Sequence, residues 1–469
     1  MASSARTRTW TRTRVILLIA FAFTVMADPV SSVAYAIEAA LRALDNNLSL
    51  LLPAMGLVVL VVALVVASYH ALVGRFPEGG GSAAAAGKAF GEGVSFIPMG
   101  ALIVDFVLTI AISVSAGASA IIAYVPSLAQ WRLSLALILL VVVAGIVWFG
   151  HIGRAVFAVL TIGFIVIAVV VLSLVSGEEP VAVTSPHVDH APLAVLLAFP
   201  VAMALATGVE APSSAIAQLG QLDDDGRRSF GRWALWLTLG IVGTLTLALT
   251  AAAVFLGVTV PHDDTTLVAE IARRGPSPAL FAAFQAATAL LLLSAASSSF
   301  QAGPGLLKAL ARHDRPGEIN HGVLPAALGR TNRHHVPVAG LAVFLVLSAV
   351  VVAIAGAYDQ RLVLFYAVAV FVSFLLGLLS MLRFEYQARR WGWVALNAAA
   401  TIAVGFTLLA NLTRPQALGS LLATAIVAAG LYAAWVRAGR PRGTANAVAE
   451  AEADAADDED ADEANEARA

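Results

Sequence analysis

The amino-acid sequence alternates long apolar runs with short polar segments along nearly all of its length. Many of the runs approach the roughly 20 residues that a helix needs to cross a bilayer. Backbone polar groups in lipid must be satisfied within their own segment, so we expect these runs to be helices. The pattern predicts twelve spans, at residues 15–44, 49–74, 97–126, 131–150, 154–176, 191–219, 231–258, 277–302, 336–357, 361–383, 392–411 and 415–437.

The first apolar run has an alternative interpretation. Four arginines precede it, as in a secretory signal peptide, and small residues near Ala27 resemble a cleavage site. The apolar character continues through Leu41, however, and further spans follow. These features favour a membrane span that is retained.

Composition agrees with a membrane protein. The 469 residues are 59% hydrophobic and 12% charged, with a mean hydropathy of +0.86. Soluble globular proteins carry about 25% charged residues. The absence of cysteine excludes disulfide scaffolds, thiolate nucleophiles and cysteine metal sites. The predicted fold class is therefore an all-α polytopic membrane protein.

The basic residues predict the orientation. With an even number of spans, both termini lie on one side of the membrane, together with all but six of the 28 Lys and Arg residues. Because basic residues are enriched in cytoplasmic loops, both termini are expected in the cytoplasm. The Ala- and Arg-rich composition favours a bacterial plasma membrane. The six exceptions are Arg42, Arg132, Arg273, Arg274, Arg361 and Arg414.

Two tails flank the predicted transporter domain at 15–437. Residues 1–14 form a basic tail, and residues 438–469 become strongly acidic and Ala-rich after Arg442. Such a segment lacks aromatic residues and repels itself, so it is expected to be disordered. A solvated tail is the preferred interpretation, with an interaction role as the alternative.

Two spans carry matching interruptions. Asp28-Pro29-Val30-Ser31-Ser32 lies in the first span and Glu210-Ala211-Pro212-Ser213-Ser214 in the sixth. Proline removes a backbone donor and can break a helix. A single motif of this kind would often be a simple kink, but matched breaks in two halves indicate a transporter's substrate site. The expected break residues are Pro29, Ser31, Ser32, Gly208, Pro212 and Ser213.

The spacing of the two motifs predicts a LeuT-like arrangement. The interrupted spans lie five apart, as expected for two inverted five-helix repeats, at 15–176 and 191–383. Residues 392–437 then supply two extra helices. Spans 1, 3, 6, 8 and 10 are expected around a central site.

Three carboxylates fall inside predicted spans: Asp28, Asp105 and Glu210. An ionised acid at mid-bilayer costs about 2.5–3.5 kcal/mol, so such residues usually face a polar cavity and serve a function. No Lys or Arg lies near the middle of a span to neutralise them. We therefore expect the three acids to bind a cation, take up protons, or do both. Glu38 lies near its helix end and is assigned to the membrane interface.

Several stretches resemble one group of transporters. They are ADPVSSVAYAIEAAL, RFPEGGGSAAAAGKAFG, ALIVDFVLTIAISVSAG, ATGVEAPSSA and LFYAVAVFVSFLLG. Together they are similar to the KimA-type potassium importers of the amino acid–polyamine–organocation (APC) superfamily, which have the LeuT fold. The resemblance implies proton-driven potassium import, with the ion held by Asp28, Tyr35, Asp105, Thr207, Glu210 and Tyr366.

Two departures from that family bear on the expectation. This chain has Phe106 after Asp105, where the family usually has Tyr, so one hydroxyl is lost. The family's folded cytosolic dimerisation domain is replaced by the acidic tail, which predicts a monomer or a weak dimer.

Other function classes are less well supported. An amino acid or amine permease of the same fold remains open, although Asp28-Pro29 would repel a substrate carboxylate. The chain lacks the Lys-Ser/Thr of a phosphate-binding loop after Gly79-Gly80-Gly81, which we interpret as a re-entrant or hinge turn. We find no selectivity-filter repeat of a channel. The sequence predicts no enzyme activity, no cofactor, no metal beyond the transported monovalent cation, and no nucleic-acid partner.

Overall fold

The computed structural model describes residues 17–150, 154–181, 190–311 and 322–466, so the predicted basic tail at 1–14 lies outside the described residues. In this part of the chain, twelve helical segments are long and apolar enough to cross a membrane, which confirms the all-α polytopic prediction. The helices of these spans are α2 (Ala27–Ala43), α3 (Leu48–Arg75), α5 (Glu92–Tyr124), α6 (Arg132–Trp148), α7 (Arg154–Val175), α8 (Ala191–Ala202), α10 (Asp224–Phe255), α12 (Pro278–Leu310), α13 (Val338–Ala355), α14 (Asp359–Gln387), α15 (Trp391–Leu412) and α16 (Pro415–Arg437).

Local chemistry fixes several helix ends. The Asn47 side chain accepts a hydrogen bond from the Ser49 N–H at the start of α3 (3.1 Å), and Asp223 caps α10 through the Gly226 N–H (3.0 Å). Side-chain oxygens there satisfy backbone donors that have no partner within the helix. Gly356, with φ of +67°, ends α13 in the left-handed conformation that glycine adopts without strain.

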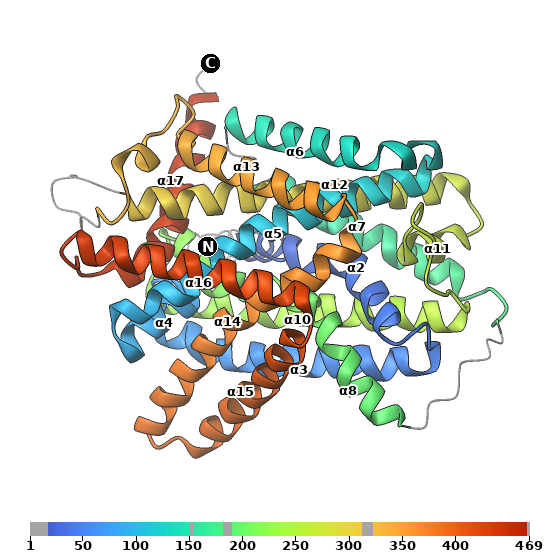
Figure 1. Cartoon of the computed structure of the whole chain (residues 1–469), viewed down its shortest axis with the longest axis horizontal. Coiled ribbons are helices and arrows are strands. Elements are labelled where there is room, and N and C mark those ends of the chain that lie inside the picture. The colour runs from blue at the N-terminus through green and yellow to red at the C-terminus, as the bar shows by residue number, and fades with distance from the viewer. Residues whose placement is uncertain (1–16, 151–153, 182–189, 312–321, 467–469) are drawn as a thin grey trace, which may run out of the picture.

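The bundle is built on helices from the two halves of the chain. The 33-residue helices α5 and α12, from spans 3 and 8, pack against each other, and α3 packs against α10. Most spans run along the long axis in Figure 1, whereas α8 and α15 are inclined to it. In each of these two pairs, the packed helices lie five spans apart in the chain.

Two short helices lie between spans. Helix α4 (Gly81–Phe90) follows α3, and α11 (Leu267–Arg273) precedes α12 at the opposite end of the bundle in Figure 1. The Gly79-Gly80-Gly81 turn has positive φ at all three residues. A Cβ at Gly79 would lie 2.6 Å from the Ser214 carbonyl oxygen, so only glycine lets this turn approach the sixth span so closely.

The sixth span is broken, as predicted. Helix α8 gives way to a 3-10 turn η2 (Met203–Ala206), a non-helical turn at 207–210, the short helix α9 (Ala211–Ala215) and η3 (Ile216–Gln218). Gly208 has φ of +70° in the turn. Pro212 and Ser213 lie inside α9, where proline near the helix start removes a donor that would have no helical partner.

The first span differs from the prediction in the position of its break. The interruption is a single turn residue, Met26, whereas Pro29, Ser31 and Ser32 are helical residues of α2. Pro29 falls in the first turn of α2, where a missing N–H is tolerated. The hydroxyls of Ser31 and Ser32 donate to the Asp28 carbonyl within the same helix at 2.7 and 3.3 Å.

The acidic segment after α16 was expected to be disordered, whereas its residues 447–466 are helical in the structure. A 3-10 turn η5 (Thr444–Asn446) leads into helix α17 (Ala447–Glu466), which packs against α12, α4, α9 and η3. Ala and Glu favour helix. The alanines also form a narrow stripe of small side chains, including Ala447 and Ala451, that are buried against the bundle. The composition of the segment gave no indication of this buried face, because acidic residues dominate that composition.

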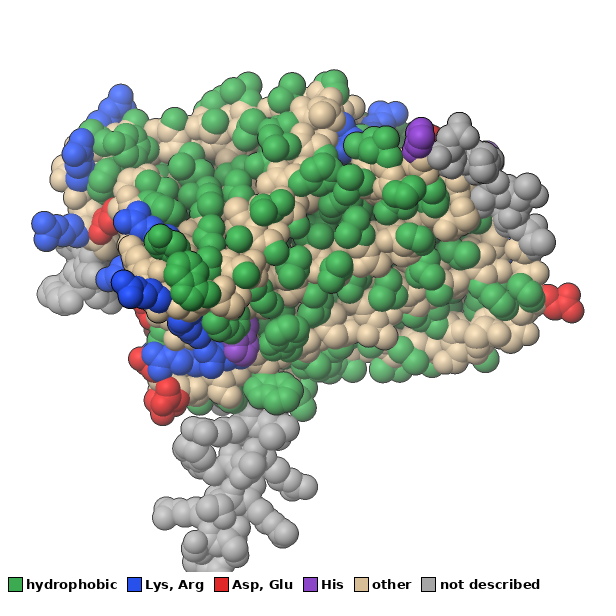
Figure 2. Space-filling view, turned by 90° about the horizontal axis from the view of Figure 1, so that it is seen from below, with side chains coloured by type: hydrophobic (Ala, Val, Ile, Leu, Met, Phe, Trp, Pro, Cys, Tyr) green, Lys and Arg blue, Asp and Glu red, His purple; other side chains and the backbone are tan. Residues whose placement is uncertain are grey.

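Basic side chains gather at one end of the molecule. In Figure 2 most Lys and Arg lie at the left, the end at which Figure 1 places α4 and α17. Exposed members of this group include Arg75, Lys88, Arg383, Arg389 and Arg437. We refer to this end as the α17 face.

Candidate transport site

A cavity of about 150 Å³ lies among the first, third, sixth and eighth spans. It brings together Asp28 from α2, Asp105 from α5 and Glu210 from the break in span 6. None of the lining residues that the structure describes is Lys, Arg or His. The three acids that the sequence singled out therefore share one cavity without a basic side chain on its wall.

Asp28 offers an oxygen to this cavity. Its Oδ1 atom is buried and has no hydrogen-bond partner among the described residues. A buried, unpartnered carboxylate oxygen is costly unless a proton or a cation satisfies it. Position 28 is therefore suited to bind either one.

The two interrupted spans meet at Asp28. A Cβ at Gly208 would lie 2.5 Å from Asp28 Oδ2 and 2.8 Å from Pro29 Cδ. The backbone of the span 6 turn thus packs directly on the start of α2. The paired motifs that the sequence placed five spans apart form one contact in space.

Glu210 is held by residues that the sequence analysis did not name. Its Oε2 atom accepts a hydrogen bond from the Tyr69 hydroxyl of α3 (2.9 Å), and Ser373 of α14 donates to Oε1 (3.2 Å). Ser82 of α4 lies 2.6 Å from the Ser373 hydroxyl. An ionised carboxylate is only an acceptor, so two donors aimed at it compensate for part of the water that it loses. Each of the three is a single hydroxyl in an apolar helix, which gave no signal on its own.

Asp105 lies on α5 and is 8% exposed. Phe106, the residue that departs from the family pattern, also lines the cavity. The aromatic ring therefore stands where a tyrosine would present a hydroxyl to the same space.

Two other predicted ligands, Tyr35 and Thr207, are not among the residues that line this cavity. Tyr35 is buried at 1% exposure, and its hydroxyl lies 2.8 Å from that of Ser32. Thr207 is equally buried and donates to the Ala204 carbonyl (2.9 Å). The side chain of Tyr366 on α14 lies outside the described residues. Span 10 instead reaches the site through the bond from Ser373 to Glu210.

Helix α12 adds hydroxyl and amide groups that were not predicted. Ser298, Ser299 and Gln301 line the cavity. The run Ser297-Ser298-Ser299 interrupts an otherwise apolar span, and this polar cluster was a signal that could have identified them. Gln218, at the end of span 6, completes this side of the wall.

Polar contacts connect neighbouring helices at the end of the bundle opposite the α17 face. Arg132 donates to the Ser119 hydroxyl (2.7 Å), which donates to Asp359 at the start of α14 (2.7 Å). Glu38 pairs with Arg42 at 2.8 Å and accepts the Leu267 N–H of α11 (3.0 Å). Glu38 therefore ties α2 to α11 and does not line the cavity, in agreement with the assignment near the helix end.

Helix α17 supplies the last part of the cavity wall. Ala451, Glu452, Ala455 and Ala456 line it together with the acids of the spans. Burial raises the pKa of Glu452 above its ordinary value of 4.5, opposed by the hydrogen bond from Gln218. A fourth carboxyl group therefore faces the cavity from outside the membrane spans.

Comparison with known proteins agrees with this architecture. The family described as "Amino acid permease" matches residues 16–434. Over 393 residues the chain is 30% identical to the potassium transporter KimA of Bacillus subtilis (strain 168), an alignment that covers 78% of this chain. The chain spans 61% of the length of that relative.

Proposed function

Since this chain belongs to the amino acid permease family, a family of membrane transporters and not of enzymes, we propose that it imports potassium together with protons by alternating access. The observation that carries the proposal is the cavity shared by Asp28, Asp105 and Glu210, with no basic residue on its described wall. The relative KimA is a potassium transporter, which supports the same substrate.

The oxygen chemistry of the cavity suits a hard monovalent cation. The groups on its wall include carboxylates from three spans and from α17, the serine hydroxyls of α12 and the amides of Gln218 and Gln301. Hard cations prefer such oxygen ligands to nitrogen or sulfur. The unpartnered Asp28 Oδ1 is the strongest single candidate for a ligand.

Proton coupling would use the same acids. A carboxyl group in a low-dielectric cavity is neutral when protonated and binds a cation when ionised. Asp28, Asp105 and Glu210 are therefore the proton-coupling candidates. In a symporter the proton and the potassium ion must be bound at the same time, so one of the three acids would carry the proton while another, ionised, binds the ion.

An organic amine is the second candidate substrate. The cavity's acids would also bind an ammonium group, and its 150 Å³ volume admits small amines. An amino acid fits less well, because its carboxylate would lie beside Asp28 and Glu210 without a basic partner. Like charges in close contact repel strongly in a low-dielectric site.

The distribution of basic residues supports import from the end of the bundle opposite the α17 face, where Arg132 lies. Exposed basic residues gather at the α17 face (Figure 2), and basic residues mark the cytoplasmic side. We therefore propose that both termini are cytoplasmic, in a bacterial plasma membrane, and that the α17 face releases the substrate.

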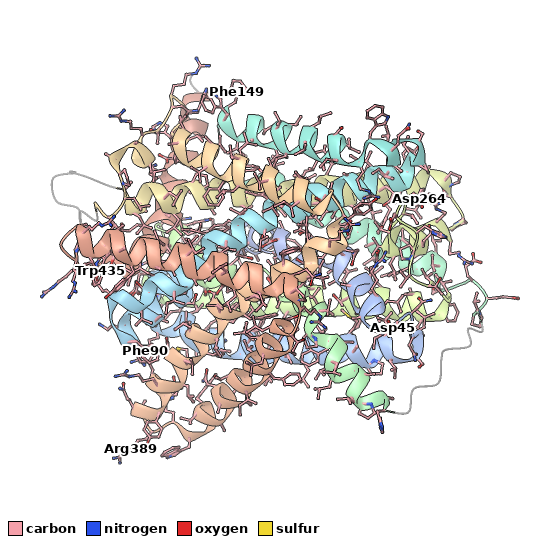
Figure 3. The ribbon with its side chains drawn as sticks, in the orientation of Figure 1. Asp45, Phe90, Phe149, Asp264, Arg389 and Trp435 are labelled. Atoms are coloured by element: carbon pink, nitrogen blue, oxygen red, sulfur yellow. The ribbon has the colours of Figure 1, made fainter. Side chains whose placement is uncertain are left out.

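The test is uptake of the potassium analogue ⁸⁶Rb⁺ by the purified protein in proteoliposomes with an imposed pH gradient. We expect uptake that collapses when the gradient is dissipated, and background uptake in Asp28→Asn. Asp45→Asn is the matched control, because Asp45 is exposed and lies at the far end of the molecule from α17 (Figure 3). Wild-type uptake by well-inserted Asp28→Asn protein would overturn the proposed site.

Competition separates the two substrate classes. Excess spermidine or putrescine should leave ⁸⁶Rb⁺ uptake unchanged if potassium is the substrate. Uptake of a labelled amine without ⁸⁶Rb⁺ uptake would replace potassium by an amine at the same acids. Growth of a potassium-uptake-deficient bacterium on low potassium gives the corresponding readout in cells.

A further inference from the structure

Helix α17 covers one mouth of the cavity. Its residues Ala451, Glu452, Ala455 and Ala456 line the same space as Asp28 and Glu210. The helix packs on α12, on α4 and on the segment η3 that follows the break in span 6. In this conformation the C-terminal segment is part of the wall, so a substrate leaving toward the α17 face meets this helix.

Polar contacts with three residues of the bundle help to hold the helix in place. Lys308 of α12 pairs with Asp458 (2.8 Å) and lies 3.8 Å from Asp454. Gln218 donates to Glu452 Oε2 at 2.5 Å, and His335 Nδ1 lies 3.5 Å from Asp458. We call the contacts of Lys308, Gln218 and His335 with α17 the latch.

The connection from α16 to α17 is fixed more firmly. Glu92, at the start of α5, accepts hydrogen bonds from the Gly443 N–H (2.7 Å) and the Thr444 hydroxyl (3.0 Å). Trp435 of α16 donates to the Pro441 carbonyl (2.9 Å), and Figure 3 shows Trp435 at the same end as Phe90 of α4. These contacts form a fixed base from which α17 can move.

The acidic charge of α17 disfavours its docked, helical state. It carries acidic residues along most of its length, including Asp457 and Asp458 in its C-terminal half. Negative charge toward a helix C-terminus is unfavourable, and neighbouring acids repel one another. Lys308, with a side chain only 13% exposed, is the main compensating cation of the latch. Among the described residues, small apolar contacts and the Lys308 ion pair therefore offset part of the charge of a strongly acidic segment.

We propose that α17 is an intrinsic gate, which closes the α17 face of the cavity when the latch is formed and must leave it for the substrate to exchange on that side. The substrate assignment rests on the proposed function, but the gate itself rests on the contacts of α17. Release of the latch opens a path from Asp28 and Glu210 past Gln218 to solvent.

The first test measures access to the cavity and needs no knowledge of the substrate. Because the chain has no cysteine, Ser298→Cys introduces a single thiol on the cavity wall. Lys308→Gln should raise its labelling rate by a small, water-soluble methanethiosulfonate about fivefold, the effect of losing a partly exposed ion pair. Lys88→Gln is the matched control, because Lys88 is the other lysine of the chain and is exposed at the same face. Equal rates in parent, control and Lys308→Gln would overturn the gate.

The second test locks the helix. A Cβ at Gly305 of α12 would lie 4.0 Å from the Ala451 Cβ, within the range of a disulfide. Oxidised Gly305→Cys/Ala451→Cys protein should lose the ⁸⁶Rb⁺ uptake that the same protein shows in proteoliposomes after reduction, whereas the oxidant should not change the uptake of either single variant. Full uptake by completely cross-linked protein would overturn the gate. Absence of uptake in the reduced and parent proteins would instead overturn potassium transport, and Ser298→Cys labelling would still decide the gate.

Discussion

The backbone of Gly208 lies against the carboxylate of Asp28, so that a Cβ at position 208 would be 2.5 Å from Oδ2. The two residues come from spans 1 and 6, the interrupted helices of the two repeats. Their contact places the turn of one helix on the acid of the other. The geometry of the Asp28 side chain therefore depends on the absence of a side chain 180 residues away.

Gly208→Ala should abolish uptake while the protein still inserts. The new methyl group would meet Asp28 and Pro29, and φ of +70° is strained for alanine. ⁸⁶Rb⁺ uptake, normalised to the amount of protein recovered in the membrane, measures the effect. Gly240→Ala on α10 is the control, because a Cβ there meets nothing within 4 Å. Normal uptake by Gly208→Ala would show that the contact does not position Asp28.

Tyr69→Phe should lower uptake by roughly tenfold or more, whereas Glu210→Gln should abolish it. Removing the hydroxyl leaves Glu210 with fewer donors, and a hydrogen bond to a charged group contributes about 1.5–3 kcal/mol. The initial rate of ⁸⁶Rb⁺ uptake across a range of concentrations checks both variants. Tyr124→Phe, at an exposed tyrosine, controls for loss of a phenol. Equal effects of Tyr69→Phe and Tyr124→Phe would argue against the network.

Phe106→Tyr should lower the KM for potassium by about two- to tenfold, the range expected for one neutral polar contact. Phe106 lines the cavity, so the added hydroxyl supplies an oxygen ligand without a change of ring size. Concentration dependence of uptake gives the KM. Phe149→Tyr, at an exposed site, should leave it unchanged. An unaltered KM in Phe106→Tyr would mean that position 106 does not contact the ion.

Acid pH should strengthen docking of α17. Burial raises the pKa of Glu452 in the docked helix above the ordinary 4.5 that it regains on release. The docked state therefore binds the proton more tightly, and docking weakens as pH rises from 4.5 through the raised value. Around this group lie Gln218 of η3, the cavity acids Asp28, Asp105 and Glu210, and the latch residues Lys308 and His335, with Asp454 and Asp458.

The measurement is the labelling rate of Ser298→Cys, divided by that of Ser298→Cys/Glu452→Gln at each pH, so that ionisation of the thiol cancels. The ratio should rise as pH increases above 4.5 toward the raised pKa of Glu452, since only the parent can ionise at position 452. Adding His335→Gln to both proteins tests whether the His335 imidazole contributes to the pH dependence of docking. A ratio independent of pH would show that ionisation of Glu452 does not control the docking of α17.

Hydropathy and charge by themselves determined the class of this protein. Long apolar runs in lipid have one solution, the helix, so the twelve spans follow from the sequence, and the acids of spans 1, 3 and 6 were identified because their cost is large. Residues of that kind can be identified from the sequence without knowledge of their spatial neighbours. The matched Pro-Ser motifs likewise predicted the broken sixth span, although the interruption of the first span lies at Met26 and not at Pro29.

Only the tertiary structure decided which groups meet. Tyr69, Ser82 and Ser373 are ordinary hydroxyls in three helices, and their bonds to Glu210 and to one another depend on packing between distant spans. Tyr35 and Thr207 found local partners and do not line the cavity. The acidic segment shows the same limit, because the described contacts of its helix include buried small alanines and an ion pair with Lys308 of a distant span. Composition records the charge of such a segment, whereas the surface that receives it exists only after the bundle has folded.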